Sequence, residues 1–126
     1  MLDIEEFKKK LDKKSRLMGI DPGKKRIGIA ISDENKIIAT PYKTLIKNEY
    51  SIFLKEIKKI IIDNDIKGVV IGNPLNMDGS SSSSSQSAKD LAINLSKDIT
   101  QYITMWDERL SSEGAFKLSS NLDVNT

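Results

Sequence analysis

Hydrophobic residues in the first third of the chain gather in short runs that predict strands. Runs 17–20 and 27–31 are separated by too few residues for a helix, so we expect an antiparallel hairpin. The Pro22–Gly23 pair between them favours a tight turn, because proline presets φ and glycine accepts a positive φ. A third run, 36–40, stops at Pro41 and would complete an antiparallel meander.

Helical spacing begins near the middle of the chain. The apolar residues of segment 52–61 repeat with the 3.6-residue period, which predicts a helix that starts after Asn48 and ends at Asp63–Asp65. The apolar run 68–72 then predicts a strand buried on both faces. In the helix predicted over segment 52–61, the side chains expected to face the core are Ile52, Phe53, Ile57, Ile60 and Ile61.

The serine run Ser80–Ser85 predicts a flexible, solvated loop. A second helix is expected over 88–100, a fifth strand over 102–106 and a short last helix over 113–118. Residues 1–15 predict an N-terminal extension or a short amphipathic helix, from the spacing of Leu2, Ile4, Phe7 and Leu11.

The predicted order is three strands followed by alternating helices and strands. This order indicates one α/β domain over 16–126, with a mixed five-stranded sheet and helices on both faces. The first strand would be central, between the antiparallel meander and the parallel strands. Asp21, Gly72–Pro74 and Asp107–Arg109 follow strands one, four and five, so we expect them to converge on one edge of the sheet.

The composition restricts the possible chemistry. The 126 residues contain no cysteine and no histidine, which excludes disulfides, thiolate and imidazole catalysis, and the usual zinc ligands. Oxygen ligands alone favour Mg²⁺ or Mn²⁺. The sequence has no apolar run long enough to span a membrane and no signal peptide pattern, so we expect a cytoplasmic protein without a membrane partner.

Positive charge is concentrated in one part of the chain. The net charge is +2, but segment 8–26 holds nine cations against Asp12 and Asp21, a local charge of +7. Such a segment is typical of proteins that bind a phosphate backbone, although lysine-rich segments are also common as solvated surface. The interpretation as solvated surface is weaker for Lys24, Lys25 and Arg26, because these residues border the Asp21 turn.

The converging residues suggest a metal-dependent reaction. Asp21 and Glu108 could share a divalent cation and support phosphodiester hydrolysis. Because Asp107 and Glu108 should point to opposite faces of the sheet, we expect one of them to be a ligand, but not both. Taken singly, Asp21 could merely cap a turn, and the acidic and basic residues after strand five could form a surface ion pair. The expected substrate contacts are Lys24, Lys25, Arg26, Asn73 and Arg109.

Three motifs in register resemble the YqgF/RuvX family of RNase H-like proteins. They are DPGKKRIGIA from Asp21, GNPLNMDG from Gly72 and DERLSS from Asp107. The resemblance implies an RNase H-like fold and a metal-dependent nuclease that matures the 5′ end of pre-16S rRNA. It carries Asp21 and Glu108 over as acidic site residues.

The chain departs from the family pattern in two places. The family's third acidic residue lies on a later helix, which we expect this chain to lack because it stops at Thr126. Asn73 stands where the family usually has leucine. Two alternatives therefore remain, a non-catalytic module that binds RNA or ribosome precursors and a Holliday-junction resolvase, which would act as a dimer rather than a monomer.

Overall fold

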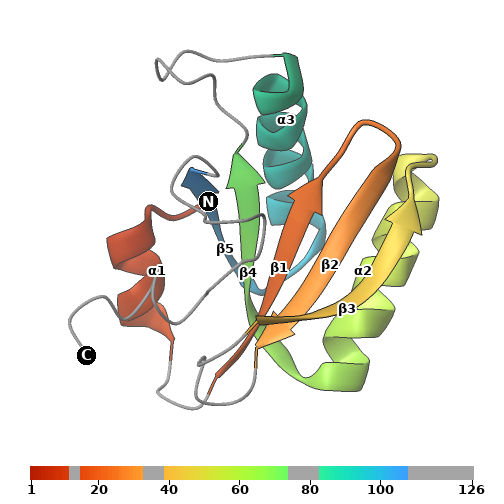
Figure 1. Ribbon diagram of the computed structural model, residues 1–126. Coiled ribbons are helices and arrows are strands. Elements are labelled where there is room, and N and C mark those ends of the chain that lie inside the picture. The colour runs from red at the N-terminus through yellow and green to blue at the C-terminus, as the bar shows by residue number, and fades with distance from the viewer. Residues whose placement is uncertain (12–14, 33–38, 74–82, 108–126) are drawn as a thin grey trace.

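The computed structural model describes residues 1–11, 15–32, 39–73 and 83–107 (Figure 1). Within these ranges the chain forms three helices and five strands. In chain order they are α1 (Ile4–Lys10), β1 (Arg16–Pro22), β2 (Arg26–Ser32), β3 (Ala39–Ile46), α2 (Tyr50–Asn64), β4 (Ile66–Asn73), α3 (Ser83–Asp98) and β5 (Tyr102–Asp107).

The strands form one mixed sheet in the order β3-β2-β1-β4-β5. β1 pairs antiparallel with β2 and β2 antiparallel with β3, whereas β4 lies parallel to both β1 and β5. The central position of the first strand and the division into an antiparallel and a parallel half are both confirmed.

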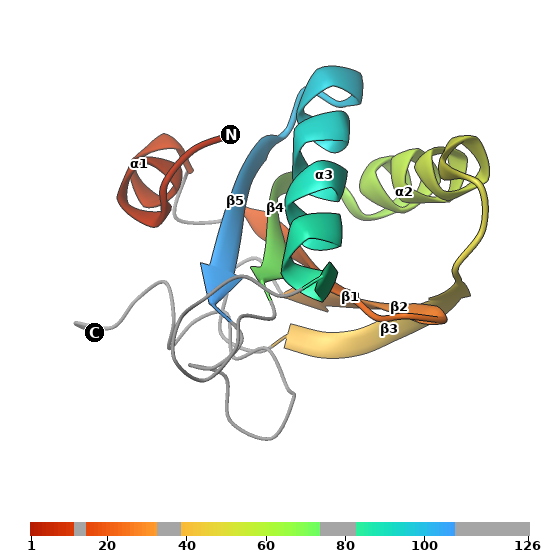
Figure 2. The same cartoon turned by 90° about the horizontal axis from the view of Figure 1, so that it is seen from above.

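Helices cover both faces of the sheet, as the sequence predicts. Helices α2 and α3 pack on one face, where Ile20, Ile57 and Leu95 belong to a single buried cluster. Helix α1 covers β4 and β5 on the other face, where Phe7 packs with Val70 (Figure 2). We call these two sides the α2/α3 face and the α1 face.

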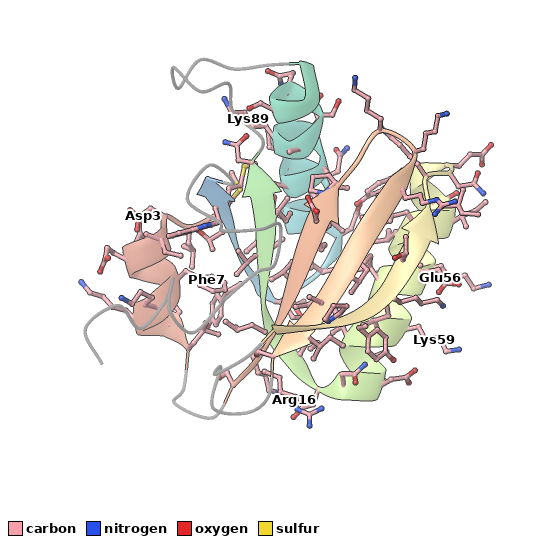
Figure 3. The ribbon with its side chains drawn as sticks, viewed as in Figure 1. Asp3, Phe7, Arg16, Glu56, Lys59 and Lys89 are labelled. Carbon is pink, nitrogen blue, oxygen red and sulfur yellow. The ribbon has the colours of Figure 1, made fainter. Side chains whose placement is uncertain are left out.

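Helix α1 is short, yet it is firmly docked. Its N-cap is Asp3, whose carboxylate accepts a hydrogen bond of 2.8 Å from the Glu6 backbone N–H. That hydrogen bond is the main cause of a lowered pKa at Asp3. The Phe7 side chain is completely buried, so this part of the N-terminus is a packed helix (Figure 3).

The third strand differs from the prediction, since it runs through Pro41 to Ile46. β3 is an edge strand, and the pairing between β2 and β3 shifts register at Ile29/Ala30, where Pro41 lies opposite Ala30. Proline is tolerated at such positions because its missing N–H removes no central ladder hydrogen bond. The prediction that Pro41 ends the strand was therefore wrong.

Helix α2 begins one residue later than predicted, with Glu49 as its N-cap, while Asn48 accepts a hydrogen bond from the Glu49 backbone N–H. It ends as expected, with Asp65 as a left-handed C-cap at φ 52°. The prediction of an inward-facing Ile52 was wrong, because 48% of this residue is exposed. The other four predicted core residues of the helix are buried.

Helix α3 starts within the serine run, so the prediction of a loop through Ser85 was wrong. Ser83–Ser85 form the first turn of the helix, and the Ser85 hydroxyl donates to the Asn73 side-chain oxygen at 2.6 Å. A short hydroxyl side chain is suited to a helix N-terminus because it can satisfy local polar groups there. Composition alone does not distinguish this use of serine from a flexible linker.

Several predictions fall outside the described residues. These are the loop 74–79, the serines 80–82, the last helix 113–118, and the site residues Glu108 and Arg109.

Candidate functional site

The carboxyl ends of three parallel strands meet at one edge of the sheet (Figure 1). Ile20 of β1 pairs with Ile71 of β4, and Asn73 of β4 pairs with Asp107 of β5. Asp21 follows Ile20 directly. The predicted convergence is therefore confirmed for the backbones of Asp21, Asn73 and Asp107.

Asp21 is exposed at this edge, on the α1 face of the sheet. Its neighbour Ile20 lies in the cluster of the α2/α3 face, and adjacent side chains of a strand point to opposite sides. Its cross-strand partner is Gly28, where an added Cβ would lie 3.6 Å from the Asp21 Cβ. Because glycine carries no side chain, space remains beside the Asp21 carboxylate for a ligand.

The β1–β2 hairpin holds the basic residues next to Asp21. The Gly23 N–H donates to the Arg26 carbonyl at 2.9 Å, and a Cβ at Gly23 would collide with that carbonyl oxygen. The φ of Gly23 lies outside the left-handed region, so this turn does not use the positive φ that glycine permits. The hairpin requires glycine because two backbone segments approach each other closely.

The three cations of the hairpin are exposed beside the edge. The Lys47 N–H donates to the Lys25 carbonyl at 2.9 Å, which ties the hairpin to the segment before α2. The hairpin therefore presents its charges from a braced backbone. This placement suits contacts with substrate phosphates, the role that the sequence predicts for Lys24, Lys25 and Arg26.

Replacing Lys24, Lys25 and Arg26 together by glutamine should weaken the binding of nucleic acid roughly tenfold at low salt. Each lost phosphate contact should also lower the slope of log affinity against log salt by about 0.7 to 0.9. Fluorescence anisotropy across a salt series measures both quantities. The matched control replaces Lys55, Lys58 and Lys59 of α2, which are exposed. Equal slopes for both triple variants would contradict a specific role for the hairpin.

Asn73 lies at the same edge as Asp21 but is held from the opposite face. Its side-chain oxygen accepts the hydrogen bond from Ser85 at the start of α3. This contact connects the end of β4 to the helix, and neither residue type alone signals it in the sequence. Asn73 thus helps to position α3, and its contact with substrate stays a prediction.

The described residues contain no group of three or more acidic, histidine or cysteine side chains that could hold a metal ion. The Asp21 carboxylate is the kind of hard oxygen donor that Mg²⁺ or Mn²⁺ prefers, and it is exposed and uncrowded. It fits such an ion as one ligand. Glu108, the predicted second ligand, lies outside the described residues.

A family model described as "RuvX: Holliday junction resolvase" matches residues 15–126. The chain belongs to this family. A Pelagibacter ubique protein named "Putative pre-16S rRNA nuclease" is 53% identical over 125 residues, which cover 99% of this chain and 83% of that protein. A protein of the same name from Gluconacetobacter diazotrophicus is 37% identical over 118 residues, 94% of this chain and 77% of that protein.

Two solved structures share the fold at low sequence identity. Thermus thermophilus RuvC, in complex with a Holliday junction substrate, matches with a TM-score of 0.53 and 8% identity over 89% of this chain and 81% of that one. Archaeoglobus fulgidus Pelota matches with a TM-score of 0.55 and 11% identity over 86% of this chain and 31% of that one. The RuvC likeness confirms the RNase H-like fold. In the described part of the chain, none of the helices has the length and apolar character needed to cross a membrane.

Proposed function

We propose that this RuvX family member is a divalent-metal-dependent nuclease that processes the 5′ end of pre-16S rRNA in the cytoplasm. The observation that carries the proposal is the exposed carboxylate of Asp21, at the end of the central strand and beside a braced cationic hairpin. The names of its relatives supply the substrate class.

Asp21 and Glu108 are the proposed ligands of Mg²⁺ or Mn²⁺. Glu108 comes two positions after Trp106, which packs in the cluster of the α1 face, the face that carries Asp21. We propose Glu108 rather than Asp107 as the second ligand, because successive side chains of an extended segment point to opposite sides. A bound divalent ion supplies an activated water and stabilises the leaving oxygen in phosphodiester hydrolysis.

The other proposed roles concern the position of the substrate. Lys24, Lys25 and Arg26 hold phosphates of the RNA beside Asp21, and Arg109 is a further candidate for bidentate phosphate contact. Asn73 lies at the same edge and keeps α3 in place through Ser85. These contacts fix the scissile phosphate relative to the carboxylates, which is the main contribution that a protein can make to such a reaction.

The family description favours one alternative, cleavage of a DNA four-way junction. The test compares two substrates, an RNA that spans the 16S 5′ leader and a synthetic four-way DNA junction. We expect cleavage of the RNA with Mg²⁺ or Mn²⁺, none after chelation by EDTA, and recovery when the metal is restored. Cleavage of the junction alone would select the resolvase function. RNA binding without any cleavage would instead favour a non-catalytic module.

A further inference from the structure

A cavity of about 390 Å³ opens near the edge of the sheet that carries Asp21, but on the α2/α3 face, opposite to the face of the Asp21 carboxylate. It begins at Pro22, one residue after Asp21, and extends between the N-terminal part of α2 and the side of α3 that carries Ser87, Asp90, Leu91 and Asn94. This volume lies within the range of about 300–1,000 Å³ that is common for small-ligand sites. The proposed nuclease function leaves this cavity unexplained.

The cavity has an apolar, aromatic wall. Tyr50 and Phe53 both line it, with ring centroids 6.4 Å apart and ring planes inclined by 40°, and Leu91 lines it from α3. The Tyr50 hydroxyl donates to an Asp98 carboxylate oxygen at 2.7 Å. Burial and then this hydrogen bond raise the pKa of Tyr50 well above its ordinary value, so the phenol stays neutral. The ring is therefore fixed between the two helices.

The polar side chains that line the cavity are acidic or neutral on the α3 side and basic on the side of the hairpin. Asp90 and Asn94, one helical turn apart on α3, supply acceptors and an amide donor, and Gln86 donates to Asp90 at 3.1 Å. Lys24 and Lys47 line the side next to the hairpin. A carboxylate repels a phosphate but accepts hydrogen bonds from base N–H groups, whereas the lysines attract phosphate.

We propose that this cavity binds one unpaired nucleobase of the RNA substrate, on a nucleotide that passes around the β1–β2 hairpin from the scissile phosphate at Asp21. The base stacks against the aromatic wall, its polar edge meets Asp90 and Asn94, and its phosphate lies near Lys24 and Lys47. A paired base cannot enter, because its Watson–Crick edge is already used. The inference rests on the proposed function and makes the site selective for single-stranded RNA.

The test measures binding in EDTA, where metal-dependent cleavage is absent, by fluorescence anisotropy. Its probes are a single-stranded RNA of about 12 nucleotides and the duplex of the same length. Asn94→Trp fills the cavity from an exposed helix position and should weaken single-strand binding roughly tenfold, with duplex binding unchanged. Ile93→Trp is the matched control, since Ile93 is 45% exposed and does not line the cavity. This variant should change neither single-strand binding nor duplex binding.

A second variant, Asp90→Asn, replaces an acceptor by an amide of the same shape and should change the preference among oligo(A), oligo(C), oligo(G) and oligo(U). Thermal unfolding confirms that each variant is folded. Unchanged single-strand affinity in Asn94→Trp, or unchanged base preference in Asp90→Asn, would overturn the proposal. Displacement of the RNA by mononucleotides at equal concentration would also overturn it, and would identify a free-nucleotide site.

Failure of the base site and failure of the nuclease proposal give different results. Metal-dependent RNA cleavage combined with inert cavity variants overturns the base site alone. The opposite result is selective single-strand binding that Asn94→Trp removes, combined with no RNA cleavage when Mg²⁺ or Mn²⁺ is present. That result supports the base site and overturns the nuclease function.

Discussion

Replacing Asp21 by Asn should abolish metal-dependent cleavage of the 16S leader RNA while leaving the fold intact. The substitution keeps the shape of the side chain but removes its charge, and a neutral amide is a much weaker ligand for Mg²⁺ than a carboxylate. We expect the cleavage rate to fall by at least about 100-fold. Because Asp21 is exposed, urea unfolding of the variant should match that of the wild type.

The matched control is Asp63→Asn, an exposed acidic residue on α2 that lies outside both the sheet edge and the cavity lining. It loses the same charge, so a rate equal to wild type excludes a general effect of net charge. RNA binding in EDTA is a second measurement, and it should change little in Asp21→Asn because no metal is involved. Full cleavage by Asp21→Asn would contradict the assignment of this carboxylate as a ligand.

The sheet could be predicted because its apolar runs are unambiguous. The run around Met18–Ile20 and the run 68–72 are apolar throughout, and in the structure both lie in the buried centre of the sheet. A short turn then requires an antiparallel neighbour, and intervening helices require parallel ones. From these two rules the shared edge of Asp21, Asn73 and Asp107 follows without a structure.

The errors concern residues whose local preference was decided by tertiary context. Pro41 ends a strand in isolation, but an edge position and a register shift accommodate it. Ser83–Ser85 are typical of a linker, but the bond from Ser85 to Asn73 fixes the start of a helix. Glycine is required at position 23 because two backbone segments approach each other closely there. From the sequence alone, this requirement cannot be distinguished from a requirement for a positive φ.

Only half of the acidic pair could be located. Asp21 has a defined strand, face and neighbour, whereas Glu108 and Arg109 lie outside the described residues. The cavity between α2 and α3 had no signal in the sequence, because Asp90 and Asn94 are ordinary residues of a solvated helix. Asp90 and Asn94 indicate a binding site only once the fold places Tyr50 and Phe53 in the same cavity.

Helix α1 packs unusually close to the sheet at Gly68, and this contact gives the largest stability prediction. A Cβ at Gly68 would lie 2.7 Å from the Phe7 ring, 2.9 Å from Leu17 and 3.1 Å from Leu11. Phe7 and Leu17 are completely buried and cannot move aside freely. Gly68→Ala should therefore lower the free energy of unfolding by about 1–3 kcal/mol, measured by urea denaturation.

Gly28→Ala is the matched control, because it adds the same methyl group to a strand of the same sheet. Its Cβ would make an ordinary contact of 3.6 Å, so it should be neutral or stabilise by up to about 1 kcal/mol. Phe7→Leu removes the ring atom that meets the new methyl group, so in a double-mutant cycle it should cost less in the Gly68→Ala background than in the wild type. Additive effects, or equal stability of the two alanine variants, would show that α1 does not depend on close packing at Gly68.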